Sequence, residues 1–320
     1  MIFTQNTTSR VYLRMRKRKD VSRFEFLQSE QDINVFGKRE AIIEGFLLER
    51  SINMIFAKAG TGKTWLCFAL AKFLADMGYD SLYLDSDNGI DVIKERGFDK
   101  HIEELSAKMT YINGDLMDDS FKEMMEVCEK IEKNAERGYE KAVFIYDSLQ
   151  FFLGGGVYDE AKINRFVTSW KKIRKAGGTV IVINHTTKKG DAMKGGGSLI
   201  NALDEVWRVD KIGEQSGHLH FNLTPEKYRM PVHEISYSVN TKTLMLTPLD
   251  TDIALMSESE KELSEKIKEL LSEKELSQGE ILKALEKSKS DKTMLNFLEK
   301  FDGKFWQVTK KANKKIYNIL

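Results

Sequence analysis

The segment AKAGTGKT at residues 57–64 constrains the fold more than any other part of the sequence. An apolar run at residues 51–56 precedes it, and residues 64–77 follow as an apolar stretch that favours a helix. Glycines allow backbone N–H groups to turn inward around an anion, and the amino end of a helix directs its positive dipole end to the same point. The order strand, glycine loop, helix therefore predicts a cradle for the phosphates of a nucleoside triphosphate.

The same loop predicts the cofactors. Lys63 would neutralise charge on the β- and γ-phosphates, and the Thr64 hydroxyl would coordinate Mg²⁺. Ala57 stands at the first position of the pattern, which accepts alanine or glycine. We therefore expect ATP and Mg²⁺ as cofactors. The loop residues expected to contact the nucleotide are Ala59, Gly60, Thr61, Gly62, Lys63, Thr64 and Trp65.

Carboxylates follow two other apolar runs. Asp147 ends the run at residues 142–146, which is the Walker B position, where a carboxylate beside the phosphate loop holds Mg²⁺. Asp85 and Asp87 follow residues 81–84, and either of them could orient the attacking water. We choose Asp87 for this role. The alternative for each of these residues is a polar side chain that caps the end of a strand.

The spacing of apolar runs predicts an α/β fold. Strands with continuous apolar character alternate with helices as far as residue 185, which is typical of a mostly parallel sheet covered on both faces. Residues 41–50 favour a short apolar helix or turn before the first strand. Residues 205–209, 218–223 and 235–247 alternate in polarity and predict antiparallel strands at one edge. We expect a basic N-terminal arm at 1–35, an ATPase domain at 36–250 and a small domain at 259–320.

Composition narrows the classes of protein. The 320 residues are 41% hydrophobic and 31% charged, and the net charge of +1 excludes a general polycation. No apolar run reaches the length of a membrane span, and the first ten residues lack the layout of a signal peptide. Cys67 and Cys128 predict reduced thiols in an intracellular protein. With no span or signal segment in the sequence, we expect a cytoplasmic protein without a membrane partner. Basic runs at 10–19 and 289–320 are either solvated faces or contacts for nucleic acid.

The last sixty residues predict a winged helix. Helices are expected at 261–271, from a capping box at 277–280, and at 291–300, and two strands at 305–308 and 315–319 surround a basic turn. Such a domain can bind duplex DNA with its third helix and its wing, or it can bind another protein. The candidate DNA contacts are Lys292, Lys310, Lys311, Lys314 and Lys315.

Taken together, residues 40–250 resemble the RecA-like ATPase superfamily, and more narrowly its hexameric helicase branch with the plasmid RepA-type and DnaB-type helicases. Residues 83–91 are similar to the RecA segment that carries the catalytic glutamate, with Asp87 in its place. The strand ending at His185 resembles the third helicase motif, in which a polar residue senses the γ-phosphate. Lys227 and Arg229 match the K-x-R element, which reaches the ATP of a neighbouring subunit as an arginine finger.

The resemblance also implies partners. Gly154-Gly155-Gly156 and the loop at 186–197 match positions of DNA-binding loops, and the second loop is followed by a helix and Asp204. It implies a homo-oligomeric ring, a hexamer, with single-stranded DNA in its channel, as in a replicative helicase of a mobile element. Two alternatives remain: a DNA-binding replication or partition regulator that uses ATP as an assembly switch, and a recombinase-like ATPase without unwinding activity. The loop lysines expected on DNA are Lys188, Lys189 and Lys194.

Overall fold

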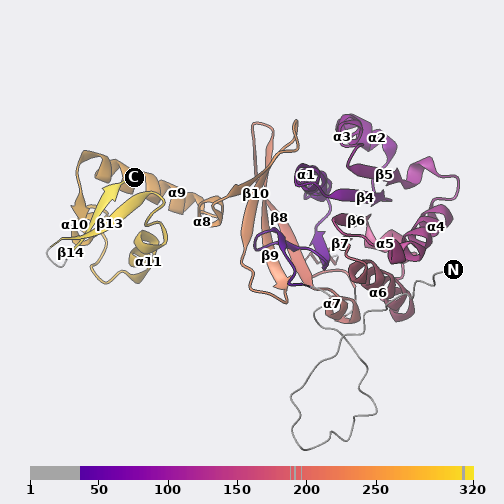
Figure 1. Ribbon diagram of the computed structural model, residues 1–320. Helices are drawn as coiled ribbons and strands as arrows, with labels where there is room; N and C mark the ends of the chain where they lie inside the picture. Colours follow the sequence, from indigo (N-terminus) through magenta and orange to yellow (C-terminus); the bar gives the residue numbers. More distant parts are fainter. Residues whose placement is uncertain (1–36, 188, 191, 196, 312–313) are drawn as a thin grey trace, which may run out of the picture.

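The computed structural model describes residues 37–320 except 188, 191, 196, 312 and 313 (Figure 1). The N-terminal arm expected at 1–35, and Lys188, lie outside these residues. The larger body is built on a nine-stranded mixed sheet in the order β11-β10-β9-β8-β3-β7-β6-β4-β5. An α/β fold with a mostly parallel sheet and antiparallel edge strands is thereby confirmed, and the sheet is consistent with a RecA-like P-loop fold.

The parallel half of the sheet carries the predicted motifs. Its strands are β3 (Ile52–Ala57), β4 (Asp80–Asp85), β5 (Met109–Asn113), β6 (Ala142–Asp147) and β7 (Thr179–His185). All of them are parallel, and β7 lies between β3 and β6. Because parallel strands end at the same edge, the phosphate loop after β3, Asp85, Asp147 and His185 come to one edge of the sheet.

Helices cover both faces of this half (Figure 1). Apolar residues of α1 (Lys63–Asp76), α2 (Ile90–Glu95) and α3 (Phe98–Glu104) belong to one buried cluster. Those of α4 (Ser120–Lys133), α5 (Leu149–Phe152), α6 (Glu160–Lys175) and α7 (Gly197–Ala202) belong to the other. Helix α1 is buried nearly all round, as its uninterrupted apolar sequence predicts. Two short 3₁₀ helices, η2 (Gly114–Leu116) and η3 (Ala135–Arg137), flank α4.

On the side of β3 away from β7, the sheet continues with four further strands. They are β8 (Glu205–Gln215), β9 (His218–Lys227), β10 (Ile235–Asn240) and β11 (Leu246–Leu249). The prediction that residues 205–209 form an antiparallel edge strand is wrong in one respect, because β8 pairs in parallel with β3 before it turns back into β9. The single alternating segment expected at 235–247 is two strands, β10 and β11, joined by a turn. Alternation in a sequence marks which face is buried, but it does not reveal the direction of the neighbouring strand.

The segment before β3 is a small hairpin and contains no helix. Strands β1 (Ala41–Ile43) and β2 (Leu47–Leu48) pair in antiparallel fashion around Gly45, whose φ of 70° suits the turn. The hairpin buries Phe46 against Trp207 with ring centroids 5.1 Å apart. This contact attaches the hairpin to β8.

The C-terminal residues form a second core of their own. The elements are α8 (Thr251–Ala254), α9 (Glu258–Glu273), β12 (Leu276–Ser277), α10 (Gln278–Ala284), α11 (Lys292–Lys300), β13 (Trp306–Lys311) and β14 (Lys314–Ile319). The strands lie in the order β12-β14-β13. The expected order of three helices and a hairpin is present, and α8 lies between the two domains expected at 36–250 and 259–320. Within the described residues, no helix combines the length and apolar character needed to cross a membrane.

Candidate functional site

The phosphate loop has the backbone that its glycines predict. Gly60 and Gly62 have φ values of 76° and 96°, and Gly62 is the residue before α1. A Cβ atom on Gly62 would lie 3.2 Å from the Phe221 ring, so a larger residue would be both strained and crowded. The Lys63 ammonium donates to the carbonyls of Ala57 and Lys58, at 3.4 and 3.2 Å. Burial lowers the pKa of Lys63.

A cavity of about 690 Å³ opens above this loop. It is lined by residues 59–65 together with Asp87, Asp147 and His185. The structure therefore brings together in one cavity the loop and three residues predicted from strand ends. Seven further lining residues were missed by sequence reasoning: Asn88, Glu95, Arg96, Lys211, Glu214, Leu219 and Thr241. Lys211 and Glu214 lie on the strand at 205–215, and Thr241 lies in the turn after the strand at 235–240. No local sequence pattern predicts that these residues line the cavity.

Asp147 lines the cavity and is buried. Its Oδ2 accepts a 2.8 Å hydrogen bond from the Tyr83 hydroxyl. Burial raises the pKa of Asp147 well above its usual range, and the charge of Asp85 raises it further. A cation bound beside the Thr64 hydroxyl would favour the ionised form of Asp147, so this carboxylate is suited to serve as an oxygen ligand.

The donor set fits Mg²⁺ brought in with a nucleotide. Thr64 lines the same cavity, and its hydroxyl donates to Asn88 Oδ1 at 3.3 Å. No cluster of three or more His, Cys, Asp or Glu side chains forms a metal site in the described part of the chain. Mg²⁺ is commonly held by one or two protein oxygens plus phosphate and water, so Thr64 and Asp147 are sufficient protein ligands.

Asp85 and Asp87 occupy different environments. The Asp85 carboxylate is buried and accepts hydrogen bonds from the backbone of Asp87 and Asn88, from the Asn88 amide and from the Tyr111 hydroxyl. Asp87 instead lines the cavity, with its Oδ2 3.6 Å from Nε2 of His185. The adjacent His185 side chain is the main cause that lowers the pKa of Asp87. Asp85 thus holds the turn, whereas Asp87 faces the space for a reacting group.

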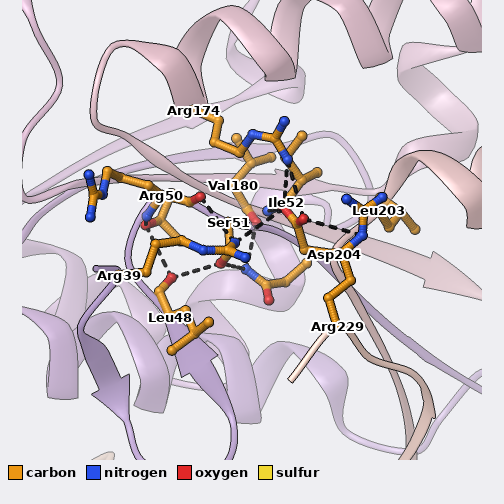
Figure 2. Close-up of polar contacts among 12 residues, drawn as sticks. Arg39, Leu48, Arg50, Ser51, Ile52, Arg174, Val180, Leu203, Asp204 and Arg229 are labelled. Carbon is orange, nitrogen blue, oxygen red and sulfur yellow. Dashed lines mark hydrogen bonds and ion pairs between the residues drawn. The ribbon is translucent and has the colours of Figure 1, made fainter. Parts of the chain in front are cut away.

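Lys227 and Arg229 lie away from this cavity. The Lys227 ammonium donates to the carbonyls of Ile200 and Leu203, at 2.6 and 2.7 Å. Arg229 donates to the carbonyl of Asn201. Its Nε lies 3.6 Å from Asp204 Oδ1 (Figure 2). Neither residue reaches the nucleotide cavity of its own chain, so their predicted contact with ATP requires a second copy.

The candidate DNA contacts fall into two groups. In the first, the Lys194 ammonium donates to Gln150 Oε1 at 2.6 Å, and Lys189 lies in the same loop. In the second, Lys292 begins α11, Lys310 and Lys311 end β13, and Lys314 and Lys315 begin β14. Lys311 is already paired with Glu275, at 2.6 Å.

Comparisons with known proteins agree with the nucleotide site. The family model described as "AAA domain" matches residues 18–191, a span that includes the phosphate loop, Asp87, Asp147 and His185. No curated protein matches the chain. Among solved structures, the flagellar accessory protein FlaH from Methanocaldococcus jannaschii is similar at 16% identity and a TM-score of 0.45, over 66% of this chain and 93% of that one. Since the family model spans more than half of the sequence, the chain belongs to the AAA domain family of P-loop ATPases.

Proposed function

We propose that this P-loop ATPase is an ATP-hydrolysing motor that acts on DNA, a ring-forming replicative helicase of a mobile element. The observation that carries the proposal is the meeting of Lys63, Asp87, Asp147 and His185 around one cavity. These residues supply a phosphate-binding cation, two carboxylates of different environment and a polar group that contacts one of them. The set is suited to hydrolysis as well as binding.

Each residue has a defined task in hydrolysis. Lys63 would neutralise charge on the phosphates, and Thr64 and Asp147 would hold Mg²⁺. When bound, Mg²⁺ screens charge on the phosphate oxygens. Asp87 would accept a hydrogen bond from the attacking water and orient it toward the γ-phosphate. His185 lies against Asp87, so the lowered pKa keeps Asp87 ionised and ready to accept that hydrogen bond.

Coupling to DNA is supported by contacts that run outward from His185. Its carbonyl accepts a 2.9 Å hydrogen bond from the backbone N–H of Lys194. The neighbouring Asn184 amide donates to the Lys194 carbonyl at 2.6 Å, and the Lys194 ammonium reaches Gln150. The loops that follow β6 and β7 are therefore fixed to the strand end that faces the γ-phosphate position. A change at His185 would be transmitted to the lysines proposed to contact single-stranded DNA.

The ring is supported by the position of Arg229, which lies outside the cavity of its own chain. In a hexamer it would complete the cavity of the next subunit, with Lys227 beside it. The C-terminal module is proposed to be a winged helix that binds duplex DNA. Should that module dominate, the protein would instead be an ATP-dependent DNA-binding regulator, or a recombinase-like ATPase, without unwinding activity.

A strand-displacement assay tests the motor. Wild type should unwind a forked duplex only with ATP and Mg²⁺, and Lys63→Ala should not. Sequence-specific duplex binding without unwinding would refute the motor in favour of the regulator.

Arg229→Ala should lose ATPase activity while it still binds nucleotide, and unchanged hydrolysis in that variant would disprove the arginine-finger role of Arg229. Mass in solution, with and without a non-hydrolysable ATP analogue and single-stranded DNA, tests the ring.

A further inference from the structure

A second cavity, of about 580 Å³, lies at the edge of the sheet opposite the phosphate loop. Six basic side chains line it together with a single acid. The lining residues are Gly37, Arg39, Arg50, Lys171, Arg174, Lys175, Asp204 and Arg229. We call the basic residues and Asp204 the arginine cluster. Such an excess of cationic side chains around one cavity favours the binding of an anion.

Asp204 organises the cluster from within. It is 1% exposed, and its Oδ2 accepts a 2.9 Å hydrogen bond from the backbone N–H of Ile52. Arg174 donates to both carboxylate oxygens, at 3.2 and 3.0 Å (Figure 2). The guanidinium groups of Arg39 and Arg229 approach to 3.7 and 3.6 Å.

The arginines arrive from three separate parts of the chain: Arg39 precedes β1, Arg174 lies on α6, and Arg229 follows β9. Asp204 can balance one of these three charges, and the neighbouring Glu205, which also interacts with Arg39 and Arg229, can balance at most a second. A guanidinium group also carries five N–H donors in a planar fork, and Asp204 engages only part of them. Figure 2 shows the three groups converging on Asp204. The buried acid therefore holds the arginines together and leaves donors and positive charge available to a ligand.

The arginine cluster and the phosphate loop are separate sites. Asp204 contacts Ile52, the first residue of β3, whereas the phosphate loop follows Ala57, the last. Six extended residues span roughly 20 Å. A nucleotide bound at the phosphate loop of a chain cannot place its phosphates in the arginine cluster of that chain.

We propose that the arginine cluster is a second phosphate-binding site, which takes the phosphates of a polyphosphate anion between Arg39, Arg174 and Arg229. Guanidinium forks match phosphate oxygens in charge and geometry, and Lys171 and Lys175 on the adjacent turn of α6 add long-range attraction. Asp204 acts as a positioning residue. The anion is either the nucleotide held by a second copy of this chain or a free polyphosphate. Only the first source rests on the proposed ring; the site itself needs neither a ring nor DNA.

Calorimetric titration with inorganic tripolyphosphate tests the site. The full chain is used in a Lys63→Ala background, in which the phosphate loop is weakened. Arg39→Gln should weaken tripolyphosphate binding by about tenfold or more, as expected for the loss of a charge-assisted hydrogen bond. The double variant Lys171→Gln/Lys175→Gln leaves every ion pair of Asp204 in place and should also weaken binding. It keeps the test valid if Arg39→Gln unfolds.

The control is Arg165→Gln, which removes an exposed cation from the same helix outside the cavity. It should bind tripolyphosphate as the Lys63→Ala background does. Absence of binding in that background, or equal binding by the cluster variants and the control, would overturn the proposal.

A mixing experiment shows whether the bound anion is the nucleotide of a second copy or a free polyphosphate. Lys63→Ala chains lack a working phosphate loop, and Arg39→Gln chains lack a complete cluster. If the anion belongs to a second copy, the two mixed together should hydrolyse ATP faster than either alone. If tripolyphosphate binds but mixing restores nothing, the site takes a free polyphosphate. Because neither measurement involves DNA, failure here is distinguishable from failure to unwind.

Discussion

At the scale of the residue, Asp87 and Asp85 show how two neighbouring acids acquire different roles. Both follow the same strand, and sequence alone offered both for the water-orienting role. The Asp85 carboxylate accepts hydrogen bonds from the backbone of the turn and from the Tyr111 hydroxyl, whereas Asp87 lines the cavity beside His185. Sequence could place both acids at the end of β4, but which one faces the cavity depends on the packing of β5, since Tyr111 comes from that strand.

Asp87→Asn should therefore lower ATP turnover by about a hundredfold or more, the usual effect of removing a group that accepts a proton or orients water. Nucleotide affinity should change little, because Lys63 and the loop backbone remain. Steady-state hydrolysis and binding of a fluorescent ATP analogue measure the two effects. The comparison variant is Asp85→Asn, which should lower the melting temperature. Full turnover in Asp87→Asn would show that another group orients the water.

Glu205 gives a prediction about pH. It is 1% exposed, and in the described part of the chain neither carboxylate oxygen has a hydrogen-bond partner. Burial, assisted by the charge of Asp204, raises its pKa from 4.5 to about 7. Between these values the folded chain holds a proton that the unfolded chain has released, so the contribution of Glu205 to stability falls as pH rises from 4.5 to about 7.

A neutral side chain of the same shape removes this loss. Glu205→Gln should be as stable as wild type near pH 4.5 and more stable at pH 8, by on the order of 2–3 kcal/mol. Denaturant unfolding at the two pH values measures the difference. Equal stability of the two proteins at pH 8 would mean that Glu205 is ionised and paired in the fold.

At the scale of the element, local sequence patterns located most of the strands, but they did not reveal how the strands pair. The apolar runs located β3, β4, β6 and β7, because a strand buried on both faces needs apolar residues throughout. Strand β8 was recognised, but its parallel pairing with β3 was not, since direction depends on where residues 186–204 return the chain. The β1–β2 hairpin was read as a helix or turn because five residues of regular structure are too few to show a period.

The C-terminal elements form a core that can be perturbed separately. Trp306 on β13 is fully buried, and its indole N–H donates to the Leu298 carbonyl at 2.9 Å. Trp306→Ala should destabilise this module by about 3–5 kcal/mol, as for other large-to-small changes in a core. ATP binding should persist, because among the residues that the structure describes the nucleotide cavity has no lining residue beyond Thr241.

The matched control is Ile319→Ala, which changes the cross-strand neighbour of Trp306. Ile319 is 43% exposed, so its loss should cost below about 1 kcal/mol. Thermal unfolding followed by tryptophan fluorescence, together with nucleotide binding, measures both variants. Loss of nucleotide binding in Trp306→Ala would mean that the two cores unfold as one unit.

At the scale of the whole molecule, charge is distributed very unevenly although the net charge is only +1. Four acids and three Lys or Arg side chains line the nucleotide cavity, whereas six Lys or Arg side chains and one acid line the cavity at the opposite edge of the sheet. The β13–β14 hairpin is a third charged region, and its lysines face one another across the two strands.

Lys310 lies directly opposite Lys315 across the β13–β14 pair, and Lys311 lies opposite Lys314. Like charges that face each other on a sheet are unfavourable unless an anion relieves them. Phosphates of duplex DNA would do so, and each contact that is lost should reduce the slope of log affinity against log salt by about 0.9. Lys310→Ala/Lys315→Ala should therefore reduce this slope by about 2 in fluorescence anisotropy titrations with duplex DNA. Lys261→Ala, which removes a cation already paired with Glu258, should leave the slope unchanged. An equal slope in the double variant and wild type would exclude the hairpin as a DNA contact and favour a protein partner for this module.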